Sequence, residues 1–225
     1  MAGIQLVGNV NNTTAQEVEV NTKAARVVIR PDDFGSLGIY GVGGISGTMA
    51  AALAAAADIF QFRWTSTTNF CLIKSVSISA GSVAAMTTAQ GAGFNLNKVT
   101  AWTADGSGGT TLTPAAGQNK LRTSMGSTGV GSIRIASTAA LTNGTRTVDT
   151  TAIAGLAFGI TTTAGVSYIT PSADLFRSNA GDYPFILSPQ ASNFEGFVIQ
   201  NSILMGAGGT FTFAVKVIWE ELTAY

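Results

Sequence analysis

The C-terminal part of the chain carries the strongest structural signal in the sequence, an alternation of large apolar residues with smaller or polar ones. In residues 210–219 the apolar positions of one strand face are Phe211, Phe213, Val215, Val217 and Trp219. Because successive side chains of a β-strand point to opposite faces, this period of two predicts a strand with one buried face. A second run, 194–200, precedes it, and the Gly-rich segment 206–209 between them is typical of a turn. We predict a long antiparallel hairpin near the core, whose truncation should unfold the domain.

Shorter runs of the same kind recur between clusters of Gly, Thr, Ser and Asn. The candidate strands are residues 59–64, 72–79, 94–102, 131–135 and 156–160. The first alternates aromatic and polar side chains, which predicts a half-buried strand, and the second should place Val76 and Ile78 inward. The third alternates through Leu96 and slips by one residue before Val99, as a β-bulge or a strand bend would. The two shortest runs are candidate edge strands.

Short strands spaced by turn residues are typical of a sandwich or barrel, and a chain of 225 residues can form one such domain. Residues 1–35 differ from the rest of the chain in their sequence pattern. A short apolar start, a polar stretch and two alternating pieces are followed by Pro31, which cannot donate a hydrogen bond to a β-ladder. We therefore expect an all-β, antiparallel, jelly-roll-like β-sandwich over residues 36–225 and an extended N-terminal arm over residues 1–35. The alternative is that the N-terminal residues supply an ordinary first strand of the sandwich.

The alanine-rich run 49–57 is the one helix-like piece, and the sequence leaves a short helix and a packed loop equally open. The run is far shorter than the ~20 residues that a membrane-spanning helix needs. The N-terminus lacks the basic start and apolar core of a signal peptide. We expect a protein made in a reducing cytoplasm, with no membrane partner.

Charged residues form only 11% of the chain, against roughly 25% in typical soluble domains. Acidic and basic residues are equal in number, so the formal net charge is zero. Near-zero charge favours association and offers no basic patch for nucleic acid, so we expect no nucleic-acid partner. So few charges suit a surface that is buried against other molecules.

Catalytic chemistry has little support in the sequence. The chain has no histidine, which excludes a Ser-His-Asp or Cys-His centre, and its one cysteine, Cys71, lies in an apolar run that predicts a buried thiol. Glu220 and Glu221 should point to opposite strand faces, where they are poorly placed to share a proton or a metal, and we expect both to be solvated. Asp32 and Asp33 follow Pro31 in a predicted turn and could join a calcium site, but they lack the spacing of any recognised calcium-binding loop. The glycine-rich run 41–47 lacks the spacing of a phosphate-binding loop and predicts tight strand packing or a subunit contact. We expect no catalytic, cofactor-binding or metal-binding residues.

Several segments of the chain resemble small virion structural proteins of tailed bacteriophages. The resemblance is carried by residues 3–9, 34–40, 46–64 and 217–225, and no single motif in it is diagnostic of a role. It implies a non-enzymatic particle component of the head decoration or cement type, on the outer surface of the head. It also implies that the chain assembles in the bacterial cytoplasm as a homo-oligomer, most commonly a trimer, with the major capsid protein as partner.

On this interpretation the N-terminal arm contacts the shell or adds to a neighbour's sheet, and removal of residues 1–30 should abolish capsid binding while the domain stays folded. The predicted contact residues of the arm are Ile4, Leu6, Val7, Val27, Ile29 and Arg30.

The alternative is a tail or fibre protein that binds a host surface glycan through loops such as 105–113. Aromatic side chains such as Trp102, Tyr168 and Phe176 could form a stacking platform for a sugar, although core or interface positions are the commoner use of such residues. A hydrolase is a remote third reading, which would need two carboxylates ~5–10 Å apart in a cleft.

Overall fold

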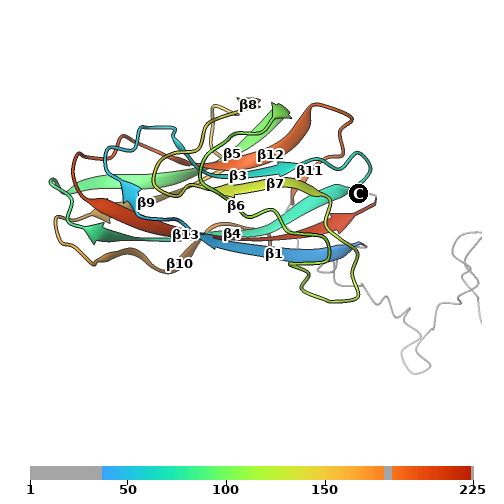
Figure 1. Ribbon diagram of the computed structural model, residues 1–225, viewed down its shortest axis with the longest axis horizontal. Coiled ribbons are helices and arrows are strands. Elements are labelled where there is room, and N and C mark those ends of the chain that lie inside the picture. Colours follow the sequence, from blue (N-terminus) through green and yellow to red (C-terminus); the bar gives the residue numbers. More distant parts are fainter. Residues whose placement is uncertain (1–36, 180–183, 224–225) are drawn as a thin grey trace, which may run out of the picture. The chain divides into compact units, whose positions relative to one another are not determined.

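A computed structural model describes residues 37–179 and 184–223, apart from the side chains of Thr170 and Pro171. Every regular element of the described part is a β-strand, and the strands form two antiparallel sheets that pack face to face (Figure 1). The predicted all-β antiparallel sandwich is therefore confirmed. The predicted arm, with its six contact residues and Asp32-Asp33, lies outside the described residues.

The described residues form thirteen strands. Their bounds are β1 (Gly38–Ile45), β2 (Met49–Ala50), β3 (Asp58–Trp64), β4 (Phe70–Ala84), β5 (Gln90–Ala104), β6 (Thr110–Thr111), β7 (Val130–Ile135), β8 (Thr145–Val148), β9 (Ala154–Ile160), β10 (Ser167–Arg177), β11 (Phe185–Leu187), β12 (Phe194–Asn201) and β13 (Thr210–Leu222). One sheet has six strands in the order β1-β13-β4-β10, with β2 paired to β13 and β11 to β4. The other has seven strands in the order β6-β7-β3-β12-β5-β8, with β9 also paired to β5.

The order of the longer strands is that of a jelly roll. The first sheet runs β1-β13-β4-β10, and the second contains β3-β12-β5 with β9 on the far side of β5. Successive long strands thus alternate between the two sheets, except that β5 pairs directly with β9. This arrangement places the last strand, β13, between the first strand, β1, and β4 at the centre of its sheet.

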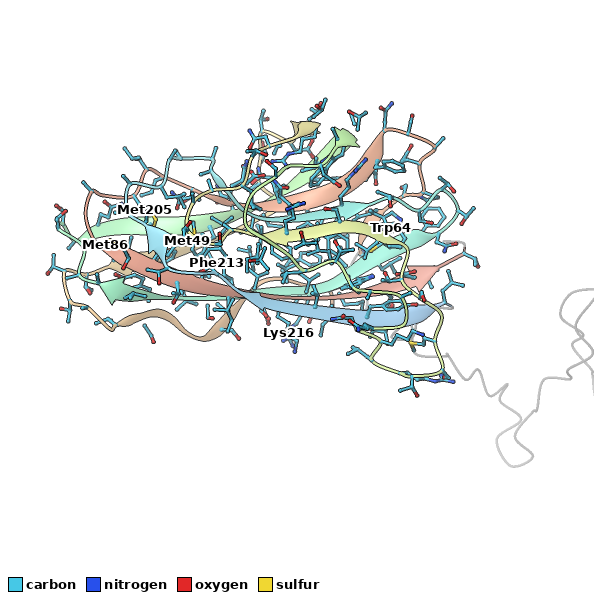
Figure 2. The ribbon with its side chains drawn as sticks, viewed as in Figure 1. Met49, Trp64, Met86, Met205, Phe213 and Lys216 are labelled. Carbon is cyan, nitrogen blue, oxygen red and sulfur yellow. The ribbon has the colours of Figure 1, made fainter. Side chains whose placement is uncertain are left out.

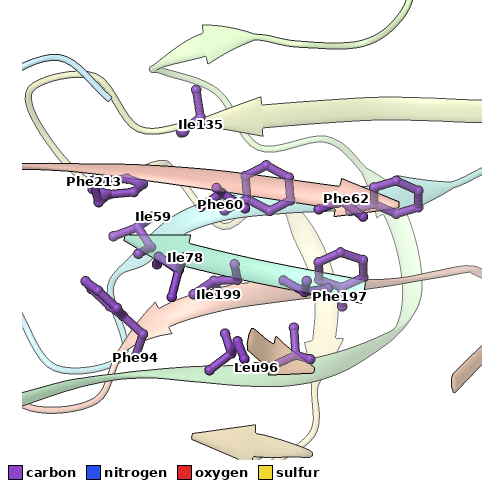
Figure 3. Packing of buried hydrophobic residues seen from close by; sticks show 14 of the residues in the cluster. Ile59, Phe60, Phe62, Ile78, Phe94, Leu96, Ile135, Phe197, Ile199 and Phe213 are labelled. Atoms are coloured by element: carbon purple, nitrogen blue, oxygen red, sulfur yellow. The ribbon is translucent and has the colours of Figure 1, made fainter. Parts of the chain in front are cut away.

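The core lies between the two sheets and is rich in aromatic side chains (Figure 3). Phe62 stacks on Phe197 with ring centroids 5.0 Å apart and meets the edge of Trp219 from the opposite sheet at 5.3 Å. All five large apolar side chains that the sequence assigned to one face of 210–219 are buried. Val76 and Ile78 are also fully buried, as predicted.

The predicted C-terminal hairpin is wrong, although both of its strands exist. β12 pairs with β3 and β5, whereas β13 pairs with β1, β2 and β4 in the other sheet. Residues 202–209 cross from one sheet to the other instead of closing a tight turn. The physical reason is that each strand has an apolar inward face, and placing the strands in facing sheets packs these two faces against each other.

The predicted bulge before Val99 is also wrong in its position. The β5–β12 register is regular from Phe94 to Val99, and the irregularity follows, between Val99 and Trp102. Leu96 joins the main core, whereas Val99 belongs to a second cluster with Trp102 and Val198. The apparent slip in the sequence therefore reflects burial on both faces of the sheet, not a break in the strand.

Three smaller expectations are resolved as well. The strand predicted at 59–64 is buried on both faces rather than half-buried, because β3 is central in its sheet and even Gln61 is buried. The alanine-rich run is not a helix but a loop that begins with the two-residue strand β2, with Met49 and Leu53 buried and most of its alanines exposed. Of the two candidate edge strands, β9 pairs only with β5, while β7 lies between β3 and the two-residue β6.

Candidate functional site

Six of the nine residues that align across the outer face of the six-stranded sheet are glycine, serine or alanine. Strand register aligns three rows across it, in which Gly41 pairs with Ile218, Gly43 with Lys216, and Ile45 with Ala214. On β4 the same rows continue through Ser75, Ser77 and Ser79. We call these nine residues the open face: Gly41, Gly43, Ile45, Ser75, Ser77, Ser79, Ala214, Lys216 and Ile218.

A groove of about 900 Å³ lies on the open face and is lined by residues of β1, β4, β10 and β13 together with Leu121. A second hollow of about 380 Å³ shares Ile45, Ser79 and Ala214 with the groove and extends it toward residues 165–169. Ile45 is 75% exposed and Leu121 57% exposed, so two large apolar side chains border the groove without cover. Such an exposed apolar rim around a hollow is typical of an interaction surface.

Among the described residues, Lys216 is the one charged side chain that lines the groove. It projects on the side of the sheet that faces away from the other sheet (Figure 2) and is exposed to solvent. The nearest other charges in its row belong to β10, where Asp174 forms an ion pair with Arg177 at 2.8 Å. The groove is therefore mostly apolar, with a single positive charge near its centre.

The edge of β1 is only partly covered. Gly41 N donates to Asn119 O and Leu121 N donates to Ile39 O, so residues 119–121 pair with the first half of the strand. No segment of the described chain pairs with this edge beyond Gly41. The free half of the edge, Gly43–Ile45, adjoins the groove directly.

The glycines of residues 41–47 fall into two classes. A Cβ on Gly44 would lie 2.4 Å from Leu112 Cδ1, and one on Gly47 would lie 2.7 Å from Ser137 O, so these two positions require close packing. A Cβ on Gly43 would meet nothing nearer than 3.9 Å. The prediction of tight strand packing is thus confirmed for Gly44, and Gly47 is closely packed in the loop after β1, while Gly43 keeps the open face flat.

The outer face of the seven-stranded sheet differs, because residues of the same chain cover it. Here Val99, Trp102 and Val198 form the second apolar cluster, against which Val148 and Phe194 pack. We call this surface the closed face. Arg146 lies over the Trp102 ring with its guanidinium carbon 4.8 Å from the ring centroid.

A buried polar network completes the closed face. Arg146 forms an ion pair with Asp58, and both side chains are almost fully buried. Asp58 also accepts hydrogen bonds from Gln61 Nε2 at 2.6 Å and from Gln200 Nε2 at 2.9 Å. The network joins β3, β8 and β12, and Gln61 extends it to the carbonyl of Thr142 at 2.8 Å.

The expectation that Glu220 and Glu221 are solvated is wrong, because both are buried. Glu221 accepts hydrogen bonds from the Thr128 hydroxyl, Gly129 N and Trp219 Nε1. Glu220 instead approaches Lys74 at 3.7 Å. The two carboxylates therefore take separate partners, and Glu221 anchors the segment around Thr128 to β13.

Burial raises the pKa of the Glu221 carboxyl above its ordinary value, although its three hydrogen-bond donors oppose the shift. Burial, followed by the nearby Glu221 charge, raises the pKa of Tyr40 to about 12 and that of the Cys71 thiol well above its usual range. Cys71 is a buried free thiol, as predicted. These groups are built into the end of the sandwich, and none of them opens into the groove.

The structure does not gather the three aromatic residues considered for a sugar platform. Trp102 is buried on β5 and donates its Nε1 hydrogen to Ala104 O. Tyr168 and Phe176 belong to β10 in the other sheet, where they pack against Phe158 and Phe185.

Among residues 37–179 and 184–223, no group of three or more His, Cys, Asp or Glu side chains is arranged to hold a metal ion. The described part of the chain also contains no helix long and apolar enough to cross a membrane.

Sequence reasoning missed the open face as a surface, because it depends on register between strands far apart in the chain. The available signal is the alternation of 210–219, which puts Thr212 and Lys216 on the strand face opposite the apolar one. Comparison with known proteins adds no assignment, since no family model, no curated protein and no solved structure matches the chain.

Proposed function

We propose that this chain is a non-enzymatic structural protein of a tailed-bacteriophage particle, a head decoration protein that binds the shell as a homo-oligomer, with a trimer favoured. The observation that carries the proposal is the open face. It consists mostly of small side chains, has one charged residue and is not covered by other parts of the described chain. Burial of the exposed apolar side chains at its rim against a neighbouring protein would contribute a favourable free energy of association.

The fold is consistent with this role. Jelly rolls form many viral capsid domains, although they also form lectin domains and other proteins, so the fold by itself leaves function open. The equal numbers of acidic and basic residues add support, because a neutral chain is not kept apart from its copies by charge.

The proposed partners are the major capsid protein and further copies of this chain, on the outer surface of the head. Within this proposal the arm contributes Ile4, Leu6, Val7, Val27, Ile29 and Arg30 to the shell or to a neighbour. The open face supplies the complementary surface, since an extended segment can add to a free strand edge through main-chain hydrogen bonds.

The absence of histidine from the chain supports a non-catalytic role. The buried acids add to this support, because Asp58 and Glu221 are held by several hydrogen bonds within the fold. A catalytic carboxylate needs access to its substrate, which these positions do not offer.

The proposal is tested by adding the purified chain to heads that lack it and counting bound copies by cosedimentation, with cryo-electron microscopy of the product. We expect saturable binding and density on the outside of the head. The variant Ser77→Arg places a long, positively charged side chain on the open face beside Lys216. It should lower the number of bound copies at least about tenfold, because the arginine would clash with a bound neighbour or be buried near a like charge.

The matched control is Thr147→Arg, which introduces the same side chain at an exposed strand position on the other sheet. This variant should bind as the native chain does. Binding only to tails, or equal occupancy for both variants, would contradict the proposed role of the open face in head decoration.

A further inference from the structure

The free half of the β1 edge can accept one more strand. Ser46 N donates to Phe213 O, and the β1–β13 pairing alternates from that bond, so the main-chain groups of Gly44 and Val42 also point toward β13. The N–H and C=O groups of Gly43 and Ile45 therefore point away from the sheet. Both residues are exposed, and no described segment pairs with them on the side away from β13.

The geometry defines which side chains an added strand should carry. Residues opposite Gly43 and Ile45 would project onto the open face, because paired residues share a face. A residue opposite Gly44 would project to the inner side, where Leu112 lies so close that a Cβ on Gly44 would be 2.4 Å from it. Apolar side chains suit that inner position.

Charge selects the outward side chains. Lys216 pairs with Gly43 in the neighbouring strand, is exposed, and forms no ion pair with any acidic residue of the described chain. Gly43 has no side chain to separate Lys216 from an added strand. A carboxylate opposite Gly43 could therefore approach the ammonium group across the glycine, whereas an arginine there would be repelled.

We infer that Glu17-Val18-Glu19-Val20 of a second copy adds to the free edge of β1, with its glutamates toward Lys216 and an intervening valine toward Leu112. This assignment rests on the proposed function, because it names the surface through which copies associate. The other alternating segment, Arg26 to Arg30, would place cations beside Lys216 and is the poorer match. Residues 21–36 would span at most roughly 50 Å at ~3.3 Å per residue, which is the reach available between the segment and its own domain.

The direct test is a zero-length carbodiimide cross-link on the full-length chain, made from a mixture of ¹⁵N-labelled and unlabelled copies. This reagent joins a carboxylate and an amine that are in contact. We expect a peptide pair that links Lys216 to Glu17 or Glu19 and contains one labelled and one unlabelled partner. A pair that forms only within single copies, or links from Lys216 to other carboxylates alone, would overturn the inference.

A charge exchange gives the second test. Lys216→Glu should weaken self-association of the full chain about fivefold in sedimentation, and the double variant Glu17→Lys, Glu19→Lys should do the same. Combining all three substitutions should restore association. Lys216 is exposed, so loss of folding does not confuse the result, and Asp174→Lys at the β10 edge serves as a control outside the proposed contact.

Different results would contradict the strand assignment and the proposed function. If the chain self-associates and decorates heads but the cross-link and the rescue are absent, the strand assignment is wrong and the proposed function stands. If the cross-link forms between copies but heads are not decorated, the assignment stands and the proposed function is wrong. Absence of self-association contradicts both the assignment and an oligomeric decoration protein.

Discussion

The outer faces of the two sheets differ in how far the rest of the chain covers them. On the closed face, Arg146, Trp102 and Val198 are covered by strands and loops of the same chain, and a buried ion pair joins β8 to β3. On the open face, glycine, serine and alanine form a flat floor with an uncovered apolar rim. The difference is that apolar side chains of the closed face pack against groups of the same chain, whereas Ile45 and Leu121 beside the open face are exposed.

The largest expected effect breaks the closed face. Arg146→Ala should lower the free energy of unfolding by about 3–5 kcal/mol, because it leaves the Asp58 carboxylate buried without its ion-pair partner. Chemical denaturation measures the change. On the open face, Lys216→Ala should alter stability by less than about 0.5 kcal/mol, since its side chain is exposed. Similar losses for the two variants would contradict the contrast between the faces.

A matched pair of glycine substitutions sharpens the same contrast. A Cβ on Gly196 would lie 2.2 Å from Phe62 O and 2.8 Å from the Trp102 ring, so Gly196→Ala should destabilise the domain by about 1–3 kcal/mol. Gly43→Ala should be neutral, or stabilising by up to about 1 kcal/mol, because its Cβ has room. Thermal denaturation of both variants checks the prediction, and a larger loss for Gly43→Ala than for Gly196→Ala would refute it.

A third prediction concerns the end of the sandwich, where Glu221 is buried. Its pKa is raised in the folded chain, so between its ordinary value of 4.5 and the raised value the folded state binds more protons than the unfolded state. Its contribution to stability is therefore full below that window and falls as the pH rises through it. The Glu221→Gln variant should lack this contribution, and the difference between variant and native chain, measured by denaturation across pH, should shrink at higher pH. A difference that stays constant with pH would disprove the assignment.

The smallest expected effect concerns Cys71, which is fully buried beside the same end of the core. Its thiol should resist alkylation in the folded chain and react once the chain is unfolded, because burial raises its pKa and blocks access. Mass spectrometry after mild iodoacetamide treatment measures the modified fraction. Rapid alkylation under native conditions would show that this end of the sandwich opens readily.

Much of the fold was predictable from local patterns, and the misses share one cause. The period of two in 210–219 correctly identified the inward face of β13, because alternation is a property of a single strand. Which strand lies beside it is decided by topology, so β12 was placed in the wrong sheet. The burial of Glu221 was missed for the same reason, since its partners Thr128 and Gly129 are over ninety residues away in sequence.

The candidate site was less predictable than the fold. The glycines of β1 and the serines of β4 are unremarkable in sequence, and they form one surface only because β13 lies between them. The low charge content of the chain indicated that some surface would be covered, but composition does not show which residues form that surface. Residues joined only by register, such as Gly43, Lys216 and Ser77, cannot be grouped from a single sequence.

The most direct test of the central claim is a cryo-electron-microscopy map of decorated heads in which this chain is traced. The account predicts that the open face, with Ile45, Lys216 and Ser77, lies against a neighbouring protein while the closed face borders solvent. A map in which the open face borders solvent and contacts are made through the closed face would contradict the account.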